Sequence, residues 1–290
     1  MHRTLVIGAT GNIGSQVVSQ LAAKGAPVRA MTRDPQTARF PAGVEAIRGD
    51  LSAPESLDAC LDGIDAVFLV FTAPGDVAAP ALERIAKRTR RIVYLSAPIK
   101  TPHPFFQQPN PVRVVVENIE RLIESSELEW TFLRPGMLAS NARLWWSHQI
   151  RSGNVVRWPY PDAATAPTCE SDIAAVAVRA LCEDGHHKAE YVLTGPESLT
   201  QAEQVTAIGR AIGRSLSVEE LSPDEARREL RYLGPEFIVN MLLNAWGAAR
   251  GLPAFVTSTI EELTGTPART FFEWATENAA EFGGEGAASA

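Results

Sequence analysis

Three glycines near the N-terminus are spaced as in a loop that binds phosphate. Gly8-Ala9-Thr10-Gly11-Asn12-Ile13-Gly14 directly follows a β-prone run at 4–7, and the apolar residues of 15–24 then recur on one helical face. In such a strand, turn and helix, glycines permit a close approach of the backbone, and the free N–H groups at the helix start attract a pyrophosphate. The spacing is Gly-x-x-Gly-x-x-Gly rather than Gly-x-Gly-x-x-Gly. We predict a dinucleotide site formed by Gly8, Thr10, Gly11, Asn12, Ile13 and Gly14.

The end of the next predicted strand, 28–31, bears on the choice between NADP(H) and NAD(H). A ribose 2′-phosphate requires a cation, whereas a free 2′-hydroxyl is usually bound by a carboxylate. Arg33 follows this strand with no acid before it, while Asp34 lies beyond it and precedes Pro35, as a turn residue does. We therefore expect NADP(H) as the cofactor. The alternatives are that Arg33 is an ordinary surface arginine and that Asp34 binds the ribose.

Strands and helices alternate through the first half of the chain. Strands are predicted at 44–47, 66–71, 91–95 and 130–133, and helices at 56–61, 79–88 and 112–125. This order predicts an α/β fold with a doubly wound parallel sheet of the Rossmann kind, which binds its ligand outside the carboxyl ends of the strands. The residues expected there, besides the glycine turn and Arg33, are Asp50, Leu51, Phe71, Thr72, Ser96 and Pro135.

Composition excludes several classes of function. The 290 residues carry a formal charge of −7, with 45% hydrophobic and 21% charged residues, which gives no basic surface for a nucleic acid. No apolar run is long enough to cross a membrane and no signal-peptide pattern is present, so we expect a cytoplasmic protein without a membrane partner. The three cysteines lack metal-ligand spacing, and no metal site is expected.

The second half predicts a smaller and mostly helical region. Helices are expected at 172–181 with Asp172 as N-cap, from Thr200 with Glu203 completing a capping box, and at 222–233, 237–249 and 271–282, with a strand at 191–194. We divide the chain into an NADP(H)-binding domain at 1–150, a substrate-capping region at 151–282 built onto the same core, and a disordered tail at 283–290.

The motifs together resemble the NmrA-like, atypical branch of the short-chain dehydrogenase/reductase superfamily. The resemblance rests on the glycine turn, Arg33, Gly49-Asp50-Leu51, Ser96 and Glu117, on Trp130-Thr131-Phe132-Leu133-Arg134-Pro135-Gly136, and on Asp172-Ile173-Ala174, Leu263-Thr264-Gly265 and Phe272-Glu273-Trp274. It covers about residues 4–282. It implies a Rossmann NAD(P) domain and a C-terminal region that closes over the substrate.

One catalytic feature of that superfamily is missing. Its catalytic members use a Tyr-x-x-x-Lys pair as proton donor, and the corresponding positions counted back from Glu117 are Pro109 and Arg113. An arginine does not give up its proton, so Arg113 is no substitute for the lysine. The remaining matched residue is Ser96, which we assign as catalytic because its hydroxyl could bind a substrate carbonyl. The alternative is a serine that only terminates the strand.

Two functions remain open. The first is an NADPH-dependent ketoreductase or quinone reductase for a large, flat, aromatic or polyketide-like carbonyl substrate, in which positioning does most of the catalysis and the proton comes from the substrate, water or Ser96. The second is a non-catalytic, NADP(H)-sensing regulator. Aromatic residues after the last predicted strands favour the enzyme, although such residues also pack cores. We assign Phe105, Met137, Trp145, Trp146 and His148 to the substrate site, and expect a monomer or a homodimer.

Overall fold

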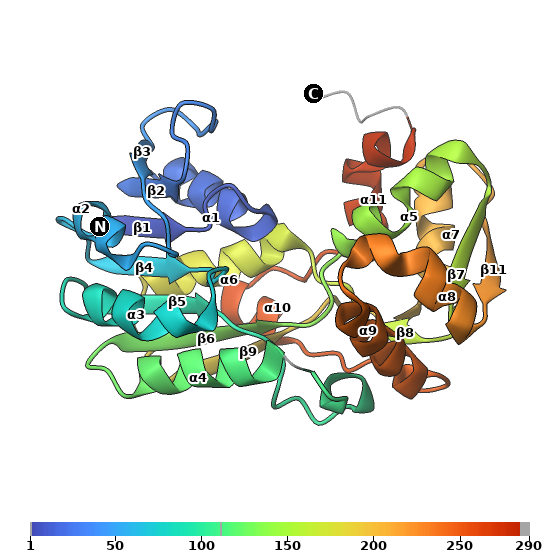
Figure 1. The fold of residues 1–290 in the computed structure, drawn as a ribbon. Helices are drawn as coiled ribbons and strands as arrows, with labels where there is room; N and C mark the ends of the chain where they lie inside the picture. The colour runs from blue at the N-terminus through green and yellow to red at the C-terminus, as the bar shows by residue number, and fades with distance from the viewer. Residues whose placement is uncertain (1, 111, 285–290) are drawn as a thin grey trace.

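A seven-stranded parallel sheet forms the centre of the larger part of the molecule (Figure 1). The computed structural model describes residues 2–110 and 112–284. The strands of the sheet are β1 (Thr4–Ile7), β2 (Val28–Thr32), β3 (Glu45–Arg48), β4 (Ala66–Leu69), β5 (Arg91–Leu95), β6 (Glu129–Pro135) and β9 (Ala189–Leu193). They lie in the order β3-β2-β1-β4-β5-β6-β9, every neighbouring pair being parallel. The predicted doubly wound fold is thus confirmed, with the winding reversing between β1 and β4.

Helices cover both faces of this sheet because its strands are apolar on both sides. One face packs against α1 (Asn12–Ala23), α6 (Glu170–Cys182) and α10 (Thr259–Thr264). The other packs against α2 (Leu57–Cys60), α3 (Ala78–Ala86) and α4 (Val112–Glu124), with the short 3-10 helices η1 (Pro54–Ser56) and η2 (Gly75–Val77) in the connections. Both layers are buried, as a parallel sheet requires.

A second unit lies beside the sheet at the carboxyl ends of its strands (Figure 1). Its elements are α5 (Asn141–Ser152), β7 (Val155–Pro159), β8 (Ala164–Thr165), β10 (Leu199–Thr200), α7 (Gln201–Ala211), β11 (Ser217–Leu221), α8 (Pro223–Glu229), η4 (Leu230–Leu233), α9 (Glu236–Ala249), α11 (Phe271–Glu277) and η5 (Ala279–Phe282). β7 pairs with β11 and β8 pairs with β10. A separate hydrophobic core fills this unit and includes η3 (Pro104–Gln107) from the loop after β5.

The chain crosses between the two units several times. α6, β9 and α10 fall within the region predicted as a cap, yet they pack on the sheet or extend it. The short strands β7, β8, β10 and β11 were not predicted, because each is recognisable only through its partner. The capping box of Thr200 and Glu203 is confirmed. The expected N-cap role of Asp172 is wrong, since α6 begins at Glu170 with Cys169 as its N-cap. Residues 285–290 of the predicted tail lie outside the described residues.

Candidate active site

An open cleft of about 290 Å³ lies at the carboxyl ends of the strands around the reversal point. This is where doubly wound sheets bind nucleotides. Its lining comes from the ends of β1 and β2, the residues after β3, and the residues after β4: Ile7, Gly8, Thr10, Met31, Thr32, Arg33, Gly49, Asp50, Leu51, Ser52, Thr72 and Ala73. β4 ends at Leu69, two residues before the predicted end, so Thr72 and Ala73 are free to line the cleft.

The three glycines of the turn have different structural roles. Gly8 has φ +88°, and a Cβ there would lie 2.8 Å from the Cβ of Val70. A Cβ on Gly14 would lie 2.1 Å from the carbonyl oxygen of Gly8, so Gly14 allows α1 to pack against the end of β1. A Cβ on Gly11 would meet only the Gly8 oxygen, at 3.4 Å, and the backbone there is extended. Gly8 and Gly14 therefore shape the turn, and Gly11 keeps the space next to it empty.

The start of α1 is suited to a phosphate group. Gly11 is the N-cap residue, and no side chain caps the helix. The first backbone N–H groups of a helix have no partner within the helix, and together with the helix dipole they attract an anion. The residues present thus fit a dinucleotide pyrophosphate: a helix start with unused donors, and a glycine that leaves room for the ligand to approach.

Arg33 and Asp34 differ in what their side chains contact. Arg33 is exposed at the edge of the cleft and forms no ion pair within residues 2–110 and 112–284. The Oδ1 of Asp34 accepts a hydrogen bond of 3.0 Å from the backbone N–H of Gln36, and the Asp34 N–H donates to the hydroxyl of Thr32 at 3.2 Å. The carboxylate therefore supports its own turn, and Arg33 is the cation available at the cleft.

The other residues predicted for the cofactor site separate into two groups. Thr10, Asp50, Leu51 and Thr72 line the cleft with Gly8 and Arg33. Ile13 lies on the buried face of α1, and the exposed Asn12 directs its amide to Ser140, at 3.1 Å. Two residues assigned to the cofactor site do not line the cleft: the half-buried Phe71 packs against the core on the α2–α4 side of the sheet, and Pro135 is buried at the end of β6. Gly136, the next residue, does reach a pocket.

A second, apolar pocket of about 160 Å³ lies between the ends of β5 and β6 and helix α9. Phe105 and Phe106 of η3 cover one side, with ring centres 4.9 Å apart, and Met137 follows β6. Met241, Leu242 and Ala245 of α9 close the other side. A narrower recess continues past Phe105 and Phe106 to Thr194 and Phe255.

His103 forms hydrogen bonds that link η3 to the loop after α9. Its Nδ1 accepts a hydrogen bond from the Phe105 N–H at 3.2 Å, so Nε2 carries the ring proton and donates to the Pro253 oxygen at 3.0 Å. Its observed contacts hold η3 next to the loop that follows α9.

Three of the five predicted substrate residues lie elsewhere. Trp146 is completely buried, and Trp145 is 7% exposed. Both pack against Trp158 with ring centres 5.7 Å apart, and Trp145 also packs against Trp246 at 5.3 Å, in the core of the second unit. His148 is exposed on α5 and lines neither pocket. The assignments of Trp145, Trp146 and His148 are corrected accordingly, since a helix with one buried face placed the tryptophans in the core.

Ser96 also has a different position from the one expected. It is buried, and its hydroxyl donates a 2.6 Å hydrogen bond to Oε1 of Glu120 on α4. Arg134 of β6 binds both oxygens of the same carboxylate, at 2.8 to 3.0 Å. Because buried parallel strands are apolar on both faces, the sequence did not show that Ser96 points to the α4 side. The expectation that its hydroxyl faces a substrate is corrected: Ser96 lines neither pocket.

The sheet, the phosphate-binding turn and the cleft at the reversal point define a dinucleotide-binding protein of the Rossmann class. A family profile described as NAD(P)H-binding matches residues 8–184. The chain belongs to this family, within the NmrA-like, atypical branch of short-chain dehydrogenases/reductases.

Two relatives are similar over almost the full chain. The (4-alkanoyl-5-oxo-2,5-dihydrofuran-3-yl)methyl phosphate reductase of Streptomyces griseus is 39% identical, covering 97% of this chain and 99% of the relative. The NAD(P)H azoreductase of Xenophilus azovorans is 33% identical, covering 96% and 99%. The fold is also that of the Escherichia coli NADPH-dependent quinone oxidoreductase in complex with NADPH, with a TM-score of 0.78, 22% identity, and 95% and 99% coverage.

No helix within residues 2–110 and 112–284 is both long enough and apolar enough to cross a membrane.

Proposed function

We propose that this protein is an NADPH-dependent reductase of a large, flat, uncharged conjugated substrate such as an aromatic or polyketide-like ketone or a quinone. The observation that carries the proposal is the apolar pocket between η3 and α9, which lies at the same edge of the sheet as the dinucleotide cleft. Aromatic and thioether side chains on opposite walls favour a flat ligand, because such a ligand buries both of its faces.

The composition of the pocket lining favours an uncharged substrate. Among the described residues that line the pocket and its recess, none is a lysine or an arginine. A phosphorylated substrate would need such a cation or a helix start to offset its desolvation. The name of the Streptomyces relative specifies a methyl phosphate, whereas the names of two others refer to an azo compound and a quinone. The apolar lining of this pocket suits an azo compound or a quinone better than a phosphorylated substrate.

The reaction needs little from the protein beyond positioning. Bound NADPH supplies a hydride, and the substrate also takes up one proton, so a ketone becomes an alcohol. Burial raises the pKa of the Tyr94 phenol well above its usual range, and the Ser96 hydroxyl donates to Glu120, so neither offers a ready proton. We infer that water or a hydroxyl of the substrate itself delivers the proton. Alignment of the two reactants contributes about 7–11 kcal/mol in favourable cases.

The test is NADPH oxidation with matched acceptors. Neutral naphthoquinones, anthraquinones and hydroxylated aromatic ketones should be reduced, and a phosphorylated analogue should be a poorer substrate. Leu242→Ala removes part of the pocket wall and should raise KM roughly tenfold, given about 0.8 kcal/mol for each buried methylene. Phe237→Ala, on the same helix but 53% exposed, is the matched control. Tight NADPH binding without turnover of any acceptor would contradict the reductase and favour a sensor.

A further inference from the structure

A chain of hydrogen bonds joins the dinucleotide-binding turn to the last α-helix of the protein. The Asn12 side chain, at the start of α1, donates to the hydroxyl of Ser140 at 3.1 Å. The backbone N–H of Ser140 donates to Oε1 of Glu170 at 2.9 Å. The indole N–H of Trp274, on α11, donates to Oε2 of the same carboxylate at 3.1 Å. Both oxygens of Glu170 are thus used, each by a different segment of the chain.

Glu170 is more deeply buried than an acid at the start of a helix needs to be. An acid in the first turn of a helix interacts favourably with the dipole while remaining in water. Glu170 is only 6% exposed, and Ser140 and Trp274 are 6% and 3% exposed. Burying a carboxylate is costly unless hydrogen bonds replace its water. The two donors and the start of α6 together supply that replacement, so the position of the Ser140 segment depends on the position of α11.

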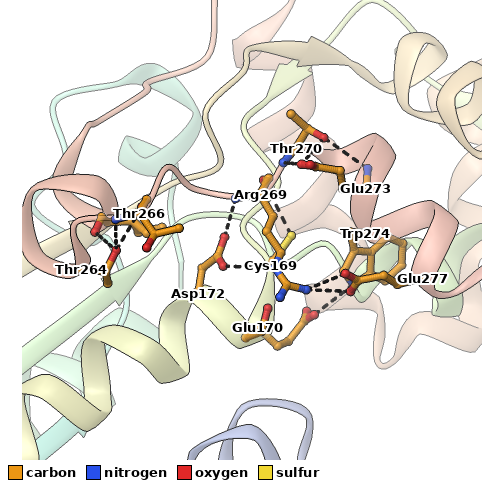
Figure 2. Close-up of polar contacts among 12 residues, drawn as sticks. Cys169, Glu170, Asp172, Thr264, Thr266, Arg269, Thr270, Glu273, Trp274 and Glu277 are labelled. Carbon is orange, nitrogen blue, oxygen red and sulfur yellow. Dashed lines mark hydrogen bonds and ion pairs between the residues drawn. The ribbon is translucent and has the colours of Figure 1, made fainter. Parts of the chain in front are cut away.

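A second buried carboxylate in the same turn provides a comparison (Figure 2). Asp172 accepts a 2.8 Å hydrogen bond from the backbone N–H of Arg269, just before α11. The Arg269 side chain in turn bonds to Glu277, within α11. Glu170 and Asp172 therefore both hold the α11 segment against α6. Only Glu170 also contacts Ser140 and, through it, reaches Asn12.

We propose that Glu170 is a positioning residue for the dinucleotide site. It holds Ser140 in place, and the Ser140 hydroxyl holds the Asn12 side chain away from the helix start, which leaves the first N–H groups of α1 free for the ligand. The same carboxylate makes the docking of α11 and the binding of the dinucleotide energetically dependent on each other, and such coupling is reciprocal. The proposal concerns dinucleotide binding, which the family establishes, and is independent of any particular substrate.

The test measures the dissociation constant of NADPH by nicotinamide fluorescence in folded variants. Glu170→Gln replaces one acceptor oxygen with an N–H₂ group, which faces one of the two donors without bonding to it. It should weaken NADPH binding about three- to tenfold, the range for one ordinary hydrogen bond. Asp172→Asn, which disturbs the same segment but not Ser140, should leave the dissociation constant unchanged. Equal losses in the two variants, or none in Glu170→Gln, would overturn the proposal.

A double-mutant cycle distinguishes positioning from general destabilisation. Trp274→Phe keeps the aromatic packing and removes only the N–H donor, while Ser140→Ala removes the acceptor of Asn12. Trp274→Phe should weaken NADPH binding in the native background and have little further effect when Ser140→Ala is present. Independent, additive effects would overturn the proposal even if Glu170→Gln failed to fold. Failure of the unmodified protein to bind NADPH would instead contradict the dinucleotide site itself.

Discussion

The role of Arg33 in cofactor choice makes a quantitative prediction. Its guanidinium lies at the edge of the cleft without an ion-pair partner in the described part of the chain, and the neighbouring acid Asp34 supports its own turn. A hydrogen bond to a charged group contributes about 1.5–3 kcal/mol, and solvent exposure favours the lower end of that range. Arg33→Ala should therefore raise the dissociation constant of NADPH roughly ten- to thirtyfold.

The assay compares NADPH with NADH, because NADH lacks the 2′-phosphate. Titration of both nucleotides should show that Arg33→Ala weakens only NADPH, and that its effect shrinks as salt is added. Arg39→Ala is the matched control, since Arg39 is an exposed arginine on the same loop whose side chain donates to backbone oxygens of residues 36–38. An equal loss for both nucleotides, or no loss for NADPH, would refute the assignment of Arg33 to the 2′-phosphate.

Further predictions concern the turn, the buried serine and a buried acid. Gly11→Val should abolish dinucleotide binding in a folded protein, whereas Gly14→Ala should unfold it, because only the Cβ of residue 14 collides with backbone; thermal melts and NADPH titration distinguish the two. Ser96→Ala should lower kcat less than tenfold and stability by about 1–2 kcal/mol, since Glu120 keeps its bonds from Arg134; a loss of a hundredfold or more would restore Ser96 as a proton donor. Burial raises the pKa of Asp172, so its folded form binds a proton at pH values where the unfolded chain has released it, and stability falls as pH rises through that window. Asp172→Asn should remove this part of the pH dependence in denaturation curves above about pH 4.

The dinucleotide site was predictable from sequence because its determinants are local. Gly8, Gly11 and Gly14 act within one turn, and Arg33 follows the very next strand. Six of the seven strands of the sheet followed from the alternation of strands and helices, whereas β9 and α6 were assigned to the cap. Nothing local could show that they return to the sheet, because their place depends on contacts with β6 and α1.

The errors at the substrate site have two physical causes. Tryptophans are equally suited to a pocket wall and to a core. Their positions in the sequence did not show that Trp145 and Trp146 fill the interior of the second unit. In addition, a strand buried on both faces has no alternation from which to infer direction, so Ser96 could not be assigned to the α4 side. Glu170 was missed for a related reason, since an acid at a helix start looks the same whether it is exposed or buried.

The dinucleotide cleft and the apolar pocket are built from different parts of the chain. The dinucleotide cleft is formed within the first 73 residues, around a turn whose geometry is set by backbone and glycine. The apolar pocket combines residues from 97 to 245, drawn from the sheet edge, η3 and α9, and its shape depends on how the second unit packs. A substitution in α9 or η3 can therefore alter the substrate without disturbing the cofactor. If the proposed function holds, substitutions in the second unit are therefore expected to change the substrate, while the bond from Asn12 to Ser140 connects the packing of this unit to the dinucleotide turn.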